Sequence, residues 1–352
     1  MPTARTTRPR RRAPGAPRPL DLALQGGGSH GAFTWGVLDA LLEDGRFRPD
    51  GISGTSAGAM NAAVLATGYA RGGAQGAREA LAAFWDHIAG APVGFGGPSA
   101  SINPLMANRD LWPGYALWES WLKLLSPYQA NPLNLNPLKD IVARHVNCAA
   151  IRSGPVKLFI TATSVRTGQP RVFEGDDLSV DALMASACLP QSSQAVVIDG
   201  EPYWDGGFAG NPALWPLVYG TDTDDVLLVQ INPLVHEGLP TTAAEIADRV
   251  NEITFNASLV AEMRAIAFVQ KLVSQKKLDP TNYKRLRMHR VADAEGLAPF
   301  DASSKLNTDP RLLQTLFNLG RNAGQRWLEQ HADAVGRNGT VDVAETFLKP
   351  RE

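Results

Sequence analysis

The sequence predicts an α/β fold in which helices cover both faces of a largely parallel sheet. Twice, within residues 20–42 and 51–66, a short apolar run ends in a glycine-containing turn and is followed by a helical pattern. Further short apolar runs typical of buried strands then alternate with helical segments. The 352 residues suffice for one large or two ordinary domains. Their composition, 44% hydrophobic and 20% charged, is globular rather than disordered or fibrous.

The expected elements follow in order along the chain. Residues 1–19 form a tail rich in arginine and proline, which we expect to be disordered, and the first strand begins at Leu20. The helix that follows has one apolar face, formed by Ala32, Trp35, Leu38, Leu41 and Leu42. The second strand ends near Ser53 and leads into an alanine-rich helix suited to a buried position. Later strands are expected at residues 156–165, 170–174, 195–199 and 225–232, with a helix at 180–187.

The C-terminal part is predicted to be mainly helical. One helix spans residues 243–277 and a second spans residues 310–330, while residues 296–305 between them have a linker-like composition. The first helix places five apolar residues on one face: Ile246, Val250, Ile253, Ala257 and Val260. We therefore expect residues 20–218 to form the sheet domain, and residues 219–352 to add the last strand and a helical region packed on that domain.

Residues 88–137 depart from this pattern. They are rich in glycine, proline and asparagine, and then place Trp112, Tyr115, Trp118 and Trp121 three residues apart on a broad helical stripe. Such stripes usually pack on the protein core. The alternatives are a cap over an acyl-binding cleft and a surface that contacts a membrane.

Charge and composition exclude several classes of function. A net charge of −1 provides no global field for nucleic acid, and no apolar stretch approaches the roughly 20 residues of a membrane-spanning helix. The basic N-terminus lacks the apolar segment of a secretory signal. Two cysteines, Cys148 and Cys188, are too few for a disulfide framework or a four-ligand zinc site, which favours a reducing, cytoplasmic location.

Residues 271–290 form a local basic segment, with seven lysines and arginines against one acidic residue. A solvated helix end is the simpler interpretation. Peripheral contact with a membrane surface is the alternative, since basic segments are attracted to anionic lipid.

Residues 54–58, Gly-Thr-Ser-Ala-Gly, match the G-x-S-x-G nucleophile elbow. In such an elbow the serine lies on a strained turn between a strand and a helix, where larger flanking side chains would collide with backbone. The segment follows a predicted strand and precedes a predicted helix, whose N-terminus directs N–H groups toward the serine oxygen. Ser56 is therefore the candidate nucleophile. The rest of the turn consists of Gly54, Thr55, Ala57 and Gly58.

A second glycine motif directly follows the first predicted strand. It fits G-x-G-x-x-G and consists of Gly26, Gly27, Gly28, Ser29, His30 and Gly31. One interpretation is a dinucleotide cradle, but the next strand lacks the acidic residue at its end that would bind ribose. The other is an oxyanion hole, in which N–H groups from about Gly27 and Gly28 approach the oxyanion of a tetrahedral intermediate. Because parallel strands end at one edge of a sheet, the loop is expected near Ser56.

Two kinds of general base are compatible with the sequence. Asp205 precedes Gly206 and Gly207, a pattern that by itself is typical of a turn. Three histidines lie C-terminal to Asp205, in the Ser, Asp, His order of α/β-hydrolases; they are His236, His289 and His331. The residues alone leave a dyad and a triad both open.

Three segments in this order and spacing, LALQGGGSHGAF, GISGTSAGAMNAA and DGG, resemble the signature blocks of the patatin-like phospholipase family. The resemblance spans about residues 20–218. It implies a three-layer α/β/α fold with a mostly parallel central sheet and a helical C-terminal extension. It also implies a dyad without histidine, with Ser56 as nucleophile, Asp205 as base and residues 26–31 as the oxyanion loop. The family loop usually has arginine or lysine where this sequence has His30.

The expected activity is hydrolysis of lipid or fatty-acyl esters, of the phospholipase A, lysophospholipase or esterase type, through an acyl-enzyme. This chemistry requires no metal or organic cofactor. One alternative is an acyltransferase that uses the same serine and passes the acyl group to an alcohol or lysolipid. The other is a catalytically silent lipid-binding module. The motifs predict the reaction type, and the resemblance supplies the lipid substrate.

Overall fold

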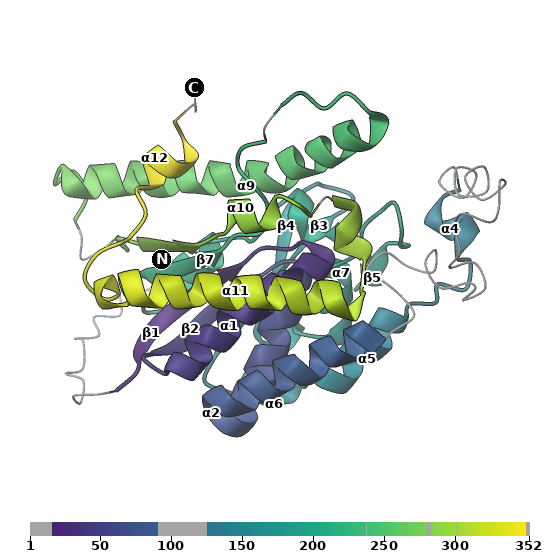
Figure 1. Ribbon diagram of the computed structural model, residues 1–352, viewed down its shortest axis with the longest axis horizontal. Coiled ribbons are helices and arrows are strands. Elements are labelled where there is room, and N and C mark those ends of the chain that lie inside the picture. Colours follow the sequence, from purple (N-terminus) through teal and green to yellow (C-terminus); the bar gives the residue numbers. More distant parts are fainter. Residues whose placement is uncertain (1–15, 91–124, 237, 280–282, 301, 350–352) are drawn as a thin grey trace.

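The computed structural model describes residues 16–90, 125–236, 238–279, 283–300 and 302–349. Its centre is an eight-stranded sheet with strand order β5-β6-β3-β2-β1-β7-β8, and β4 pairs with β3 off this path. The strands are β1 (Arg18–Leu24), β2 (Phe47–Gly54), β3 (Lys157–Ser164), β4 (Pro170–Phe173), β5 (Val196–Ile198), β6 (Glu201–Asp205), β7 (Asp225–Val229) and β8 (Arg287–Val291). Helices lie on both faces of the sheet (Figure 1), which confirms the predicted three-layer α/β/α fold with a mostly parallel sheet.

The sheet reverses its direction of growth at β1. This strand pairs in parallel with β2 on one side and with β7 on the other, and β2–β3 and β7–β8 are also parallel. The pairs β3–β4, β3–β6 and β5–β6 are antiparallel. In open α/β sheets a site forms where the strand order reverses, beyond the carboxyl ends of the strands. The loop after β1 occupies that position here.

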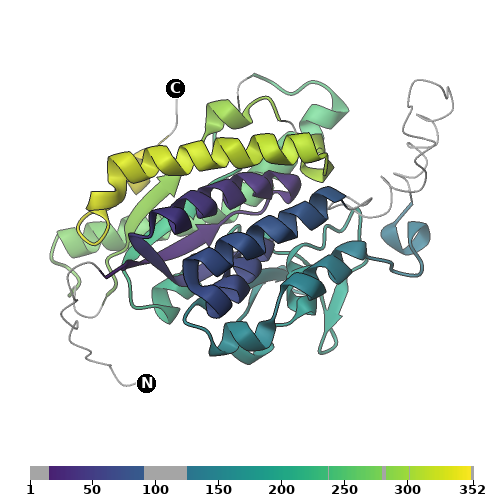
Figure 2. The ribbon, with the colours of Figure 1, turned by 60° about the horizontal axis from the view of Figure 1, so that its bottom comes forward.

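Long helices cover one face of the sheet. They are α1 (Gly31–Asp44), α2 (Ala57–Gly90) and α11 (Pro310–His331), which lie side by side in Figure 2. Shorter helices continue this layer: α5 (Pro137–His145), α6 (Cys148–Ser153) and α7 (Val180–Ser186). The opposite face is covered by α8 (Trp215–Gly220), α9 (Ala243–Ser274) and α12 (Val343–Phe347). Two further short helices, α4 (Pro127–Ala130) and α10 (Ala294–Leu297), lie in connections.

Alternation along the strands divides the core between the two layers. In β1, Leu20, Leu22 and Leu24 pack into the cluster of α1, α2 and α11, while Ala23 packs into the cluster of α8, α9 and α12. This period of two is what a strand with both faces buried requires. The apolar run predicted from Leu20 therefore serves both layers.

Two helices distant in sequence, α1 and α11, approach closely through glycine. A Cβ on Gly36 would overlap the carbonyl oxygen of Phe317, and a Cβ on Gly320 would overlap the carbonyl oxygen of Phe33. Arg321 of α11 also pairs with Asp39 of α1. The C-terminal region is thus fitted against the first helix of the chain.

The structure corrects three boundaries expected from sequence. Strand β1 begins at Arg18 rather than Leu20, because Arg18 pairs with Phe47 and donates a hydrogen bond to the carbonyl of Val335. Strand β6 ends in the Asp-Gly-Gly segment that alone suggested a turn. The region 219–352 contributes two strands to the sheet, β7 and β8, where one was expected.

Strand β8 was missed because it lies in the basic segment 271–290. Met288 and His289 are buried, while Arg287 pairs with Asp224 and Asp225 of the neighbouring strand region. Lys284 donates hydrogen bonds to Leu217 and Thr221. A large part of this segment therefore serves the fold, which weakens the interpretation of the whole segment as a membrane-binding surface.

The apolar face predicted for residues 243–277 is exposed. Ile246, Val250 and Ile253 are 47%, 56% and 54% exposed, whereas Leu259 and Met263 pack on the sheet. The periodic pattern missed the buried side of α9 because that side includes a polar residue. Asn256 is buried there and donates a hydrogen bond to the carbonyl of Pro233.

The expected disordered tail and aromatic cap are largely untested. Residues 1–15 and 91–124 lie outside the described residues, and the second range contains Trp112, Tyr115, Trp118 and Trp121. Across the part of the chain that is described, none of the helices combines the length and apolar character needed to cross a membrane.

Replacing Gly320 with alanine tests the close contact of α1 and α11. In an open helical position this change would stabilise the helix by about 1 kcal/mol. Here the new Cβ would overlap the backbone of Phe33, so we expect the free energy of unfolding to fall by about 1–3 kcal/mol in urea titrations. Gly72→Ala is the control, because nothing lies within 4 Å of a Cβ at that position. Equal stabilities of the two variants would contradict the prediction.

Candidate active site

Ser56 lies at a sharp turn between β2 and α2, as the elbow motif predicts. Its φ is +54°, a backbone conformation that a residue with a side chain adopts only at a cost. Neighbouring glycines make room for the turn, since a Cβ on Gly58 would overlap the carbonyl oxygen of Leu24. The N–H of Ser56 donates to Oγ of Ser186 at 2.9 Å. These contacts hold the serine between a strand end and the first turn of a long helix.

Thr55 connects the three segments that contain the predicted site residues. Its N–H donates to the carbonyl of Leu24, at the end of β1, over 3.3 Å. Its hydroxyl donates to the carbonyl of Gly210, just beyond the Asp-Gly-Gly segment, over 2.6 Å. The glycine loop, the elbow and the aspartate segment are therefore held together at one residue.

Asp205 lies at the end of β6, close to the elbow. In the sheet Gly54 pairs with Ile160 of β3, and Asp205 pairs with Ala162, two residues farther along the same strand. Asp205 is 1% exposed, its carboxylate accepts a hydrogen bond from the N–H of Gly207 at 2.7 Å, and it lines one pocket together with Ser56. The structure thus brings together the predicted nucleophile and one of the predicted bases.

Burial has a large effect on Asp205. Loss of hydration raises the pKa of its carboxyl group from 3.8 to about 7, although the hydrogen bonds from Gly207 and Ser56 lower it. Phe255 of α9 lies against Gly207 and in edge contact with Phe208, closing this side of the carboxylate from water. A carboxylate with a pKa near 7 is a far stronger base than an exposed aspartate and is still partly ionised at neutral pH.

The glycine loop lies directly beside the serine. A Cβ on Gly26 would be only 2.8 Å from Cβ of Ser56. Gly28 has a φ of +55°, and a side chain there would overlap the carbonyl of Lys305. Gly27 is buried between them, and Ser29, His30 and Gly31 lead into α1. The sequence placed loop and serine at one edge of the sheet, and their backbones are in contact.

Buried amide side chains support this loop from behind. Oδ1 of Asn211 accepts the N–H of Gly26 at 2.7 Å, and Nδ2 of Asn232 donates to the carbonyl of Gly26 at 3.1 Å. Gln25 donates to the carbonyl of Asn211 and accepts the N–H groups of Ile231 and Asn232. Such a connected buried network rigidifies the backbone that it holds. These amides could not be recognised as neighbours from the sequence, because they come from three separate segments.

Ser56 and Asp205 line a shared pocket. Its walls are the glycines 26–28 and 207, the polar side chains Asn211 and Lys305, and the apolar side chains Ala187, Leu189, Phe255 and Leu306. The lining of the pocket therefore combines polar groups with apolar side chains. Lys305 is the last residue of segment 296–305, whose composition is typical of a linker, and Leu306 directly follows this segment. This segment instead packs on the glycine loop, where Nε2 of His30 lies 2.6 Å from Oγ of Ser304.

None of the three candidate histidines is among the residues that line this pocket. His236 pairs with Glu252, with 3.3 Å between Nδ1 and Oε2. His289 is fully buried in β8 and bonded to Asp225 at the amino end of β7. His331 lies at the end of α11 beside Trp327. Within the described residues, Ser56 and Asp205 are thus brought together without a histidine.

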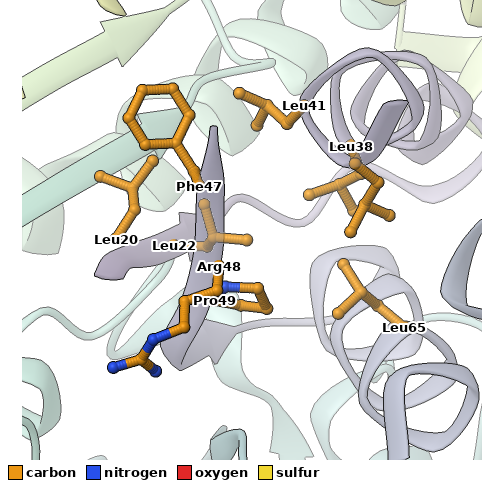
Figure 3. Close-up of a pocket in the computed structure, with 9 residues that line it drawn as sticks. Leu20, Leu22, Leu38, Leu41, Phe47, Arg48, Pro49 and Leu65 are labelled. Carbon is orange, nitrogen blue, oxygen red and sulfur yellow. The ribbon is translucent and has the colours of Figure 1, made fainter. Parts of the chain in front are cut away.

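A second hollow lies at the opposite end of the sheet. Figure 3 shows it between the first two strands and helices α1 and α2, lined by Leu20, Leu22, Leu38, Leu41, Phe47, Arg48, Pro49 and Leu65. Its lining contains no nucleophile or carboxylate. The described residues also contain no cluster of three or more histidine, cysteine, aspartate or glutamate side chains that could hold a metal ion.

A comparison of the sequence with known protein families places part of this chain in one of them. The patatin-like phospholipase family model matches residues 22–218. No curated protein matches the sequence. The solved structure of VipD from Legionella pneumophila is 13% identical, with a TM-score of 0.37, over 86% of this chain and 67% of that chain. Type III effector protein ExoU is 19% identical, with a TM-score of 0.34, over 90% of this chain and 53% of that chain.

A complex of SpcU with ExoU from Pseudomonas aeruginosa is also similar. It is 18% identical, with a TM-score of 0.28, over 93% of this chain and 76% of that chain. In one of these three comparisons the chain spans about half the length of the protein that it matches.

The raised pKa of Asp205 predicts a pH-dependent stability. Between pH 3.8 and about 7 the folded protein holds a proton that the unfolded chain has lost, so this group lowers stability as pH rises through that range. Asp205→Asn removes the effect. We therefore expect the melting temperature of the variant, relative to wild type, to be higher at pH 8 than at pH 4.

Asp44→Asn is a control in which the pKa of the removed group is shifted in the opposite direction. The Arg46 side chain lowers the pKa of Asp44, so its contribution to stability is present above pH 3.8 and is lost only below it. The melting temperature of this variant, relative to wild type, should therefore change little between pH 8 and pH 4. A melting-temperature difference for Asp205→Asn that does not vary with pH would contradict the prediction.

Proposed function

The chain belongs to the patatin-like phospholipase family, and we propose that it is a lipid acyl hydrolase that cleaves carboxylic esters through a Ser56–Asp205 dyad. Family membership supports lipid hydrolysis at a coarse level. The finer proposal is an activity of the phospholipase A, lysophospholipase or esterase type. One observation carries it: Ser56, at the strained elbow, and the buried carboxyl group of Asp205 line the same pocket.

In the first step Asp205 accepts the proton of the Ser56 hydroxyl while the serine oxygen attacks the ester carbonyl. The position of α2 assists, because the helix begins at the residue after Ser56 and its positive end faces the developing charge. The N–H groups of the glycine loop bind the oxyanion of the tetrahedral intermediate. Collapse of that intermediate releases the alcohol, which takes up the proton from Asp205, and leaves an acyl-enzyme.

In the second step water attacks the acyl-enzyme, with Asp205 again accepting the proton. A second oxyanion forms and collapses to release the fatty acid and restore the serine. An acyltransferase would replace water with an alcohol or lysolipid in this step. The apolar side of the pocket, formed by Ala187, Leu189, Phe255 and Leu306, suits a hydrocarbon chain next to the ester.

The proposal is tested by measuring hydrolysis of a series of p-nitrophenyl esters with short to long acyl chains. Phospholipid vesicles serve as a second substrate in parallel assays. We expect product release by wild type and none detectable with Ser56→Ala. Asp205→Asn should lose about 10²–10⁴-fold in kcat, the usual contribution of a general base. The chain-length optimum would measure the apolar part of the pocket.

Matched controls are Ser153→Ala and Asp181→Asn. Both residues lie on other helices, and Asp181 forms an exposed ion pair with Lys139. Both variants should retain wild-type rates. An active Asp205→Asn variant would show that another group is the base. A folded wild type that transfers acyl groups without hydrolysis would favour the acyltransferase, and a wholly inactive one would favour the lipid-binding module.

The pKa of Asp205 also predicts a pH profile. The base must be ionised, and its pKa is raised to about 7 by burial, so kcat/KM should rise from acidic pH, reach half its maximum near pH 7 and level off above it. The profile should be measured with a neutral ester, whose own ionisation does not change. A rate that is constant from pH 5 to pH 8 would contradict the assignment of Asp205 as the base.

A further inference from the structure

The pocket contains a lysine that the proposed mechanism does not use. Lys305 comes from the short helical segment Ala302–Leu306, far in sequence from both Ser56 and Asp205. Among the described residues that line the pocket, it is the only lysine, arginine or histidine. Its carbonyl oxygen lies where a side chain on Gly28 would be, so its backbone touches the glycine loop. A cation is therefore built into the wall of the site.

The ammonium group of Lys305 faces an amide rather than a carboxylate. Nζ donates to Oδ1 of Asn232 at 2.9 Å, and no carboxylate of the described residues lies within ion-pair distance of it. Burial lowers the pKa of Lys305, and the more distant charges of Glu252 and Asp248 oppose that shift by favouring the protonated form. Glu252 itself pairs with Arg249 at 3.0 Å. Asn232 is thus the hydrogen-bond acceptor that the described residues offer to this ammonium group.

Asn232 passes this interaction to the glycine loop. While its Oδ1 accepts from Lys305, its Nδ2 donates to the carbonyl of Gly26 at 3.1 Å. Asn232 is 1% exposed, so water does not compete for either bond. Hydrogen bonds in series polarise one another, and the effect is strongest where the local dielectric constant is low.

The Gly26–Gly27 peptide is the last member of this series. In a planar trans peptide the N–H points opposite to the carbonyl. Because the carbonyl of Gly26 faces Asn232, the N–H of Gly27 is directed away from Asn232. That N–H donates to no acceptor in the described part of the chain, and Gly27 lines the pocket with Ser56. It is one of the N–H groups that sequence analysis assigned to the oxyanion.

We propose that Lys305, acting through Asn232, is a positioning residue for the oxyanion hole. It holds the Gly26–Gly27 peptide with its N–H available to the oxyanion and strengthens that N–H as a donor. The inference rests on the proposed function and adds to it a residue from the C-terminal region. His30 contributes by anchoring the segment, since its ring bonds Ser304 at 2.6 Å and lies edge-on to Phe300.

The test uses p-nitrophenyl butyrate, an ester without an anionic group, so that any effect of Lys305 on a charged headgroup is absent. Lys305→Met removes the charge and keeps the length of the side chain. We expect kcat to fall about 10–100-fold with KM within twofold of wild type, less than the loss of a complete oxyanion donor. Lys305→Arg retains the charge and should keep most of the activity.

Asn232→Asp provides a second variant that is expected to fold. Its carboxylate still accepts from Lys305 but has no Nδ2 to donate to Gly26. We expect a loss of kcat at least as large as that of Lys305→Met. Because the two residues act in series, the double variant should lose less than the product of the two single losses. A loss in the double variant equal to the product of the two single losses would contradict action through Asn232.

A pair of inhibitors gives a readout that a merely structural role would not change. An alkyl trifluoromethyl ketone forms a tetrahedral adduct with the serine and places an oxyanion in the hole, whereas the matching methyl ketone binds as a carbonyl. In Lys305→Met the inhibition constant of the first should rise by the factor lost in kcat/KM, and that of the second should stay within twofold. Equal changes for both ketones would overturn the proposal.

Other outcomes separate this inference from the proposed function. A loss confined to anionic phospholipid vesicles, or to KM, would make Lys305 a headgroup contact and overturn the positioning role. Wild-type activity in Lys305→Met would also overturn it. If wild type neither hydrolyses the neutral ester nor reacts at Ser56 with a fluorophosphonate, the proposed function itself fails. If the wild type is labelled and active and the variants are unaffected, only the inference about Lys305 is contradicted.

Discussion

The strained turn at Ser56 is the constraint on which the rest of the site depends. A non-glycine residue at a φ of +54° costs on the order of 1–3 kcal/mol unless its surroundings stabilise it. Here the surroundings are backbone and hydroxyl groups of other segments: Leu24 and Gly210 bond Thr55, and Ser186 bonds Ser56. The same contacts that hold the turn also bring the glycine loop and the aspartate segment to it. The contacts that stabilise the strained turn are therefore also the contacts that assemble the site.

A second feature of the site is that it buries two ionisable side chains of opposite charge. Asp205 and Lys305 both line the pocket. Burial raises the pKa of Asp205 and lowers that of Lys305, and both changes favour the neutral form of the side chain. Such groups lower stability unless hydrogen bonds compensate. Gly207 bonds the carboxylate, and Asn232 bonds the ammonium group. The apolar packing of Phe255 and Phe208 lies beside Asp205 and helps to keep water from its carboxylate.

The C-terminal region has a larger part in the structure than a helical extension would. It completes the sheet with β7 and β8, and α11 packs on α1 so closely that glycine is required on both helices. Its segment Ala302–Leu306 then reaches the glycine loop. Because α11 starts at Pro310, a short connection after that segment, the packing of α1 against α11 also helps to position Lys305. Core packing and the wall of the pocket are therefore coupled through one connection.

The sequence by itself determined the features that depend on neighbouring residues. Strand–turn–helix order, the elbow around Ser56 and the glycine loop after the first strand are local patterns, and the fold class follows from their repetition. Asp205 was a candidate from sequence, but only the family resemblance distinguished it from a turn, because β6 is short and Asp205 pairs with Ala162 of β3, which is distant in sequence. The buried side of α9, the strand β8 and the role of residues 296–305 could not be predicted from periodicity, since polar residues in them are buried through distant partners. Lys305, Asn232 and Asn211 reach the glycine loop only through tertiary contacts, because hydrogen bonds between segments separated by some 70 to 200 residues leave no periodic pattern in the sequence.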